Sequence, residues 1–465
     1  MLTLAAALTA AQQTGRVGIR LLAVKTEEEA ASLRTRLQAG ETFGDLAKTY
    51  SSAPSAPDGG WLGLFVVADL RKEFREALEK LVPGQVSPIV KLSDEYMLLE
   101  LVPEAETHVA LGCELADQGK LDDAVSEFRA ALRLNPQYAQ AHYYLGAALY
   151  ELDNGVEEAS AEFREAIRLD PQNAEAHNTL GLALLEQGDP DEAMREYREA
   201  LRINPHYAEA HYNLGNALDD QGKPDAAVDE YREALRINPA LAAALYNLGV
   251  ALRHQGRLDE AMVEYREALR VNPGLAQAHQ ALGKALDDQG KHDEAIAEYR
   301  EALRINPNYG VAHYNLGVAL KDQGKLDDAI AEYREALRVN PHHAEAYSNL
   351  GVALKDQGKL DEAVKEYRVA LGINPNDATL HNNLGVAISD QGELEEAIAE
   401  YREALRINPG FALAHYNLGE SLRQLDDRAG AIREFRDFLR LAPGRPDSKE
   451  RVERARSILS ELEKP

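Results

Sequence analysis

The chain has 465 residues, and 51 Lys and Arg against 78 Asp and Glu give it a formal net charge of −27. This acidity excludes a general nucleic-acid binder, because neutralising phosphates requires clustered Lys and Arg, and it argues against a membrane-surface protein with basic amphipathic helices. A single cysteine excludes an intrachain disulfide and any cysteine-rich metal module. No run of the sequence approaches the roughly 18 apolar residues that a transmembrane helix needs.

Residues 1–17 form a tail that allows two interpretations. The run MLTLAAALTAA at the start is apolar and ends on small residues, like the core and cleavage site of a secretory signal. The basic segment that normally precedes such a core is missing, since the first basic side chain is Arg16. The protein is therefore either exported to the periplasm, or cytoplasmic with a frayed or docked N-terminus.

Residues 18–104 predict a small α+β domain with an antiparallel sheet. Apolar strands are expected at residues 20–24 and 96–102. A loop rich in Ser, Pro and Gly is expected at residues 51–63. Helices are expected at residues 27–37, within 40–50, and at 71–81.

Several segments of this domain resemble the parvulin-type peptidyl-prolyl isomerases. They are residues 22–30, 39–43 with 46–47, 50–51, 59–60, 62–63, Phe74 and 83–87. The resemblance covers residues 18–103 and implies the parvulin fold. It also implies an apolar pocket for proline, whose positions are occupied here by Leu62, Leu70 and Phe74.

The positions that carry the family's catalytic polar groups differ in this chain. Leu21 and Met97 stand where the family has histidines, and the loop position that is usually Cys or Asp falls near Ala53. All 13 histidines lie at or beyond His108, so a shift of register does not restore the pair. We expect a domain that binds proline-containing peptides with weak or no isomerase activity. The alternatives are an active isomerase that recruits clients through the rest of the chain, and a relic domain that only caps it.

Residues 105–445 consist of ten repeat units. Each unit closes with a proline, at intervals of 34 residues after a first interval of 35. In the fourth unit, apolar residues at helical spacing around Leu214 and around Tyr231 predict two helices, separated by a break at Gly222. The closing prolines are Pro136, Pro171, Pro205, Pro239, Pro273, Pro307, Pro341, Pro375, Pro409 and Pro443.

This pattern resembles the tetratricopeptide repeat. The match consists of Leu-Gly in the first helix, a small–aromatic–small pattern in the second, and the closing proline. It implies a mainly α protein, a right-handed α-solenoid whose first helices line a concave peptide-binding surface. Residues 446–465 are expected to form a helix that caps the last unit with an apolar stripe. The stripe consists of Val452, Ala455, Leu459 and Leu462.

The sixth position of the repeat suggests how a peptide would bind. Asparagine occupies it in six units, close to tyrosines and valines, so amides could bond to the backbone of an extended protein or peptide client. The alternative is that asparagine is only the consensus of the repeat. The candidate peptide-binding residues are Asn213, Asn247, Asn315, Asn349, Asn383, Asn417, Tyr212, Tyr246, Tyr314 and Tyr416. The lysine–asparagine clamp that holds chaperone carboxylates is absent, since Tyr212 precedes Asn216 where the clamp would need lysine.

No catalytic residue, cofactor or metal ion is expected. Eight histidines share the fourth position of their units, about 10 Å apart by helix packing, which is too far for a common metal and indicates a structural role. Cys113 has no basic neighbour at nucleophile spacing. The sequence leaves the oligomeric state open and favours a non-catalytic interaction scaffold. The eight histidines are His108, His142, His177, His211, His279, His313, His381 and His415.

Overall fold

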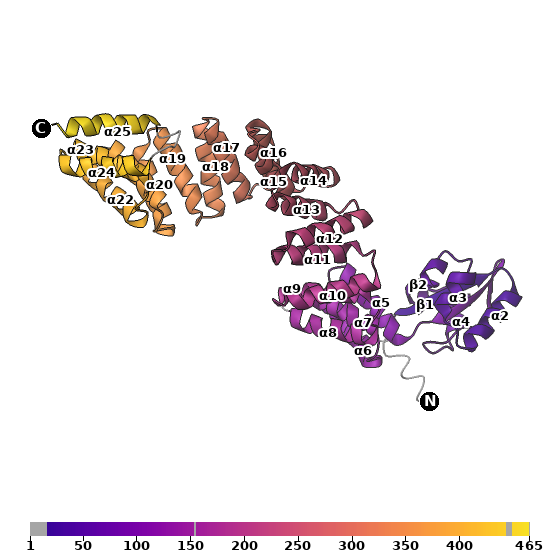
Figure 1. Ribbon diagram of the computed structural model, residues 1–465. Coiled ribbons are helices and arrows are strands. Elements are labelled where there is room, and N and C mark those ends of the chain that lie inside the picture. The colour runs from indigo at the N-terminus through magenta and orange to yellow at the C-terminus, as the bar shows by residue number, and fades with distance from the viewer. Residues whose placement is uncertain (1–15, 153–154, 443–448, 465) are drawn as a thin grey trace. The chain divides into compact units, whose positions relative to one another are not determined.

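A computed structural model describes residues 16–152, 155–442 and 449–464 of the chain. It separates into two compact units, Met1–Pro239 and Ala240–Pro465, which are described here one at a time. The first unit contains a sheet domain followed by helices, and the second contains helices (Figure 1). The signal-like run at the N-terminus lies outside the described residues. No described helix combines the length and the apolar character that crossing a membrane requires.

The first unit opens with a four-stranded antiparallel sheet in the order β2-β1-β4-β3. Its antiparallel character agrees with the sequence. Two strands were not predicted: β2 begins inside the expected loop, and β3 is only three residues long. Both form because they pair with the apolar central strands. The strands are β1 (Arg16–Val24), β2 (Trp61–Val66), β3 (Val90–Leu92) and β4 (Glu95–Leu101).

Side chains alternate across the central strands, so the sheet has two apolar faces. Leu22 and Leu98 pack under α2 and α3 on one face, while Leu21 and Leu99 pack with Leu78 of α4 on the other. Thr26 starts α2 with a capping box, which satisfies backbone donors at its first turn. The helices are α2 (Glu27–Gln38), α3 (Phe43–Tyr50) and α4 (Lys72–Leu78), with short 3-10 turns η1 (Ala56–Asp58) and η2 (Val67–Asp69).

Eight helices of four repeat units complete the first unit. Only two residues separate the end of β4 from the start of α5, so the sheet runs directly into the repeats. Each repeat is a pair of antiparallel helices, as the sequence predicts. The helices are α5 (Glu104–Asp117), α6 (Leu121–Leu134), α7 (Ala139–Tyr150), α8 (Val156–Leu169), α9 (Ala174–Glu186), α10 (Pro190–Ile203), α11 (Ala208–Asp220) and α12 (Pro224–Ile237).

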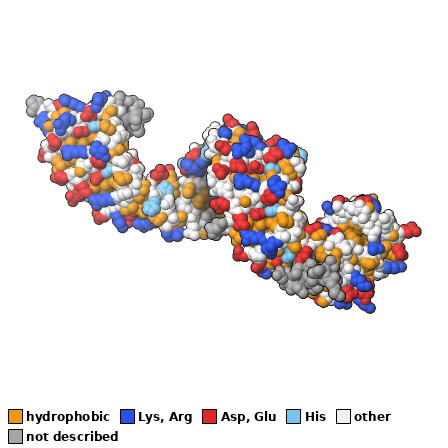
Figure 2. Space-filling model, turned by 90° about the horizontal axis from the view of Figure 1, so that it is seen from below, with side chains coloured by type: hydrophobic (Ala, Val, Ile, Leu, Met, Phe, Trp, Pro, Cys, Tyr) orange, Lys and Arg blue, Asp and Glu red, His pale blue; other side chains and the backbone are white. Residues whose placement is uncertain are grey.

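The second unit contains six further repeats and a final helix. Figure 2 shows one face of the molecule, on which acidic and basic side chains are interspersed over the repeats. The helices are α13 (Ala242–His254), α14 (Leu258–Val271), α15 (Ala276–Asp288), α16 (His292–Ile305), α17 (Gly310–Asp322), α18 (Leu326–Val339), α19 (Ala344–Asp356), α20 (Leu360–Ile373), α21 (Ala378–Asp390), α22 (Leu394–Ile407), α23 (Ala412–Gln424), α24 (Arg428–Leu441) and α25 (Lys449–Leu462).

The glycine of each first helix explains how closely the two helices of a repeat approach. At Gly317, an added Cβ atom would lie 2.7 Å from Cε1 of Tyr333, which is fully buried on the partner helix. A side chain there would displace the ring, because closer than about 3.5 Å two carbon atoms repel. A second glycine, Gly324, has φ +76° and turns the chain between the helices, a conformation that glycine adopts without cost.

Helix α25 packs against α24. Ala455 is fully buried, and Val452, Leu459 and Leu462 are half-buried. The Arg436 guanidinium forms an ion pair of 2.7 Å with Glu463 just beyond the helix. The helix therefore covers the apolar side of the tenth repeat.

Deleting residues 447–465 is expected to lower both the solubility and the melting temperature. The deletion exposes the surface under the stripe, and each apolar side chain taken out of water contributes about 1.5–3 kcal/mol. Thermal unfolding and sedimentation measure the two effects. A chain ending at residue 462 keeps the stripe and serves as the control. Unchanged melting and solubility of the shorter chain would show that α25 does not stabilise the array.

Candidate functional site

The positions that would carry parvulin histidines lie together in an apolar cluster of the sheet domain. These positions are Leu21 on β1, Met97 on β4, and Ala53 in the loop between α3 and η1. Their exposed fractions are 9%, 8% and 8%, and all three belong to this cluster. Alkyl and thioether groups offer no strong hydrogen-bond donor. This region of the sheet can therefore hold an apolar ring by contact, but these three side chains cannot orient a peptide group.

Leu62, Leu70 and Phe74 line the same region. They are half-buried and pack against the cluster of Leu21 and Met97. Leu62 comes from β2, Leu70 follows η2, and Phe74 comes from α4. The structure thus brings together, on one face of the sheet, all the residues that the sequence singled out in the N-terminal domain, which we call the head.

On the opposite face of the sheet, beside the apolar side chains packed under α2 and α3, a charged cluster ties the sheet to the repeats. Arg20 of β1 forms ion pairs with Glu100 of β4 at 2.9 Å and with Glu106 of α5 at 2.5 Å. Burial raises the pKa of Glu100, although Arg20 donates a hydrogen bond to it. Arg16 pairs with Glu114 further along α5 at 2.9 Å. These bonds fix the first repeat against the sheet.

Three of the sixth-position asparagines connect adjacent repeats. In the first compact unit, Met1–Pro239, Asn213 donates from Nδ2 to Oδ1 of Asn178 at 3.0 Å. In the second unit, Asn349 donates to the hydroxyl of Tyr314 at 3.0 Å, and Asn417 donates to Oδ1 of Asn382 at 2.9 Å. Each acceptor occupies the fifth position of the preceding repeat. Sequence reasoning did not foresee this bond, although asparagine or tyrosine at the fifth position marks where it forms.

The remaining candidates of the groove differ in exposure. Asn247, Asn315 and Asn383 are half-buried, and Asn383 accepts a long hydrogen bond of 3.5 Å from its neighbour. Tyr416 is only 9% exposed and donates to Glu420 at 3.2 Å, so it is largely a packing residue. The tyrosines that pack on second-helix rings, with centroids 5.9–6.2 Å apart, are Tyr212, Tyr246, Tyr314 and Tyr416.

A pocket opens between the first helices of successive repeats in the second compact unit, α17, α19 and α21. Its volume is about 210 Å³, and it is lined by Tyr314, Ser348, Asn349 and Asp377 among others. Asp377 accepts from two backbone N–H groups at the start of α21 and is therefore occupied as a helix cap. The pocket joins an aromatic ring to an amide, the combination that the sequence suggested for a peptide groove.

The eight fourth-position histidines each hold their own repeat together. In every case Nδ1 lies 2.5–2.6 Å from a glutamate of the second helix. In six repeats Nε2 also lies 3.1–3.4 Å from the carbonyl oxygen of the proline that precedes the first helix. These contacts agree with the structural role that the spacing indicates.

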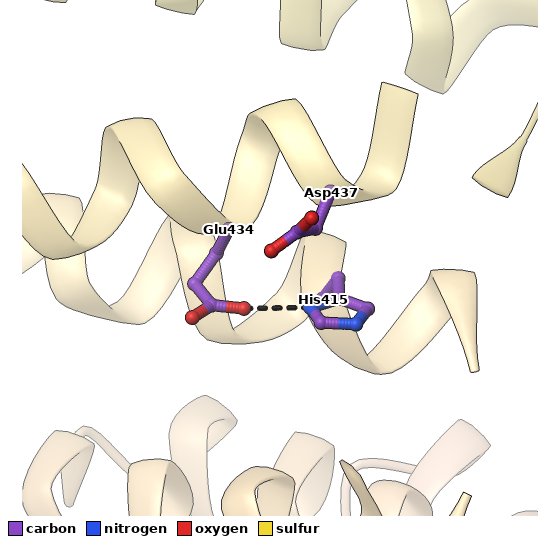
Figure 3. A group of neighbouring side chains, drawn as sticks. All are labelled: His415, Glu434 and Asp437. Atoms are coloured by element: carbon purple, nitrogen blue, oxygen red, sulfur yellow. Dashed lines mark hydrogen bonds and ion pairs between the residues drawn. The ribbon is translucent and has the colours of Figure 1, made fainter. Parts of the chain in front are cut away.

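One of these histidines lies in a group that resembles a metal site. His415, Glu434 and Asp437 present ligand atoms within 4.8 Å of one another (Figure 3). Nδ1 of His415 is bonded to Glu434, its Nε2 reaches the carbonyl of Pro409, and Asp437 pairs with Arg440 at 2.8 Å. The same histidine–glutamate pair recurs in seven other repeats, so repeat packing accounts for it.

Cys113 is half-buried on α5. Burial, reinforced by the charge of Asp117, raises the pKa of its thiol to about 11. The thiol is therefore protonated at neutral pH and a poor nucleophile, because the thiolate is the reactive form.

Known proteins match both parts of the chain. The family model of the PPIC-type PPIASE domain matches residues 22–102. Models of the tetratricopeptide repeat match residues 109–174, 153–208, 178–242, 212–270 and 314–378, and residues 251–290, 285–324 and 389–426.

Individual relatives resemble only parts of the chain. The foldase protein PrsA of Geobacillus sp. (strain WCH70) is 44% identical over 84 residues, which is 18% of this chain and 30% of the relative. The chaperone SurA of Methylobacillus flagellatus is 32% identical over 118 residues, or 24% of this chain and 26% of the relative. This chain thus spans less than a third of the length of these relatives. The structure of YrrB, described as a TPR protein with an unusual peptide-binding site, aligns at 25% identity and a TM-score of 0.38, covering 40% of this chain and 96% of YrrB. The chain is a tetratricopeptide-repeat protein with a PPIC-type rotamase domain at its N-terminus.

Proposed function

We propose that the protein is an interaction scaffold of the foldase or chaperone kind, which binds extended peptides in its repeats and proline-containing segments on its head. The observation that carries this proposal is the convergence of Leu62, Leu70 and Phe74 on the apolar cluster that replaces the polar groups of a parvulin. A surface of this kind favours contact with a proline ring, and the matches to proteins named foldase and chaperone support the same reading.

In the second unit, the peptide would run along the first helices. An extended chain advances about 3.3 Å per residue, and helices packed about 10 Å apart would offer one asparagine roughly every third residue. Among the described residues, none donates to Oδ1 of Asn349 or Asn417, whose Nδ2 groups bond to the preceding repeat. These oxygens would accept from peptide N–H groups, so the shape of the client matters more than its side chains.

Replacing Asn315, Asn349, Asn383 and Asn417 together with alanine is expected to weaken the binding of an extended client. Each lost hydrogen bond costs about 0.5–1.5 kcal/mol, so the loss should reach at least about thirtyfold. The measurement is titration of the full chain with a reduced, carboxymethylated protein.

Two double variants separate binding from packing. Asn315→Ala with Asn383→Ala removes amides that do not bridge repeats, and it should weaken binding at unchanged melting. Tyr314→Phe with Asn382→Ala removes the acceptors of the bridging bonds but keeps all four asparagines, and it should affect melting more than binding. Undiminished binding by the quadruple variant would show that asparagine is only the consensus of the repeat.

The second candidate function is peptidyl-prolyl isomerisation, which the match to the PPIC-type domain favours. We expect turnover at least about fivefold below that of a parvulin with its histidines, because the two lost orienting hydrogen bonds are worth at least about 0.5 kcal/mol each. A protease-coupled assay on the full chain measures it, with Phe74→Ala as the variant. Ordinary parvulin turnover that disappears in Phe74→Ala would establish the isomerase instead of the scaffold.

A further inference from the structure

A second pocket lies in the first unit, where the sheet meets the first two repeats. Its volume is about 660 Å³. The sheet domain contributes Trp61 and Pro57, and the repeats contribute Cys113, Tyr138 and Tyr144. We call it the junction pocket. It lies within the range of about 300–1,000 Å³ that is usual for ligand sites.

The junction pocket is on the other side of the sheet from Leu62, Leu70 and Phe74. Arg20 lines the pocket and pairs with Trp61 in the sheet. Because side chains alternate along β1, Arg20 lies on the face of Leu22, opposite to that of Leu21. The pocket is therefore separate from the apolar cluster that would contact proline in a parvulin.

The walls of the junction pocket are held in place without a ligand. The backbone N–H of Val102, next to the start of α5, donates to the carbonyl of Gly18 at 3.0 Å. A Cβ atom on Gly18 would lie 3.1 Å from the Trp61 ring, so the indole rests directly on the backbone of β1. Arg20 and Glu106, both lining residues, form an ion pair. Because the walls are already ordered, a ligand would bind without the entropic cost of ordering them.

The polar groups of the pocket carry no net charge. Arg20 and Lys48 are balanced by Asp58 and Glu106. Burial raises the pKa of Tyr138 to about 12, so its hydroxyl stays protonated. It donates a long hydrogen bond of 3.5 Å to Gln140, which a ligand carbonyl could replace. The indole N–H of Trp61 is a donor only. Three aromatic rings with donors at their edges match a ligand that has apolar rings and unpaired carbonyl groups.

We infer that the junction pocket binds a proline-containing segment in the polyproline II conformation. Such a segment has no internal hydrogen bonds and little conformational entropy to lose, and its prolines supply carbonyl acceptors without N–H donors. Aromatic-lined grooves recognise this conformation in general. The inference goes beyond the proposed function, because it needs neither the asparagines of the second unit nor the surface around Leu70.

The pocket contains its own reporters for a test. Trp61 is the single tryptophan and Cys113 the single cysteine of the chain, and both line the pocket. The full chain is titrated with a ten-residue polyproline peptide while Trp61 fluorescence is followed. Length-matched Ala-Gln and Lys-rich peptides serve as comparisons. We expect a saturable change with polyproline, at an affinity at least tenfold higher than with either comparison, and slower alkylation of Cys113 when polyproline is bound.

Variants on the two faces of the sheet locate the site. Tyr144→Ala should weaken the polyproline binding reported by Trp61 at least tenfold. Leu92→Ala, on the opposite face and outside the proposed proline surface, should leave it unchanged. Tyr144 also packs on Phe128, with ring centroids 5.9 Å apart, so Tyr144→Phe preserves folding and should retain the ring contact with most of the affinity. Equal affinity for the Ala-Gln or the Lys-rich peptide would overturn the assignment to proline, as would no protection of Cys113. Loss of binding in Leu70→Ala alone would move the site to the parvulin surface.

Discussion

Replacing Tyr333 with alanine is expected to lower the free energy of unfolding of the second unit by about 3–5 kcal/mol, the usual cost of removing a buried aromatic ring. Tyr333 is fully buried, and its ring fills the space opposite Gly317. No side chain on the facing helix can move into the hole, because that helix presents glycine there. Chemical denaturation followed by circular dichroism measures the loss.

The conservative variant Tyr333→Phe isolates the contribution of the ring. The hydroxyl of Tyr333 is buried without a hydrogen-bond partner among the described residues. Removing it should leave stability unchanged or raise it slightly, since an unsatisfied buried polar group costs about 1–3 kcal/mol. The chain already carries phenylalanine at this repeat position in Phe128, Phe163 and Phe435.

Tyr231→Phe provides the opposite control. Its hydroxyl donates to Oδ1 of Asn216 at 2.8 Å, so removal takes a donor from a half-buried amide and should cost about 1 kcal/mol. If Tyr333→Phe were as destabilising as Tyr231→Phe, an ordered water would have to satisfy the Tyr333 hydroxyl, and its assignment as unpaired would be wrong.

The repeats could be predicted from the sequence because each of their signals is local. Helix periodicity, the glycine turn and the closing proline all act within about ten residues, and the 34-residue period repeats them. The strands β2 and β3 could not be predicted in this way. β2 depends on β1, a partner far away in the chain, through pairs such as Trp61 with Arg20. β3 pairs with the adjacent β4, but its three residues are too short to give a strand pattern of their own.

The candidate sites divide in the same way. The convergence of Leu21, Met97 and Phe74 followed from the resemblance of the head to a family with a known arrangement. The bond between Asn417 and Asn382 was missed, because it joins residues 35 positions apart and requires the geometry of adjacent repeats. The junction pocket was missed for the same reason: only the direct run from β4 into α5 brings Trp61 near Tyr144.

Two histidines of the repeats, His313 and His415, should make the stability of the array depend on pH. In six repeats the two ring nitrogens face a carboxylate and a backbone carbonyl, both of which only accept hydrogen bonds. A neutral imidazole has one N–H and can satisfy only one of them, whereas the imidazolium has two. At His313 and His415 these native contacts favour the protonated ring.

The pKa shifts agree with this geometry in two repeats. The hydrogen bond to Glu332 raises the pKa of His313 above its usual value and outweighs burial. Burial lowers the pKa of His415, but the bonds to Glu434 and to the carbonyl of Pro409 raise it overall. Their side chains are 11% and 12% exposed, so solvent screens these bonds little.

The sign of the effect follows from the direction of the shift. A histidine whose pKa is higher in the folded state than its ordinary value of about 6.5 binds its proton more tightly when folded. Its contribution is complete below about pH 6.5 and is lost as the pH rises through the folded-state pKa. We therefore expect the melting temperature of the array to fall as the pH is raised from about 6 to about 8.5.

Substitutions identify the groups responsible. His313→Gln combined with His415→Gln should lower the melting temperature at pH 6 and reduce its decrease towards pH 8.5, because glutamine does not titrate. His342→Gln should change neither, since His342 is exposed in a turn between repeats. A melting temperature that rises with pH, or a slope that the double variant leaves intact, would mean that the rings are neutral in the folded chain and that one of the two acceptors bonds to water instead. The two histidines lie in different repeats, so the single variants His313→Gln and His415→Gln should each remove part of the pH dependence, and their effects should add.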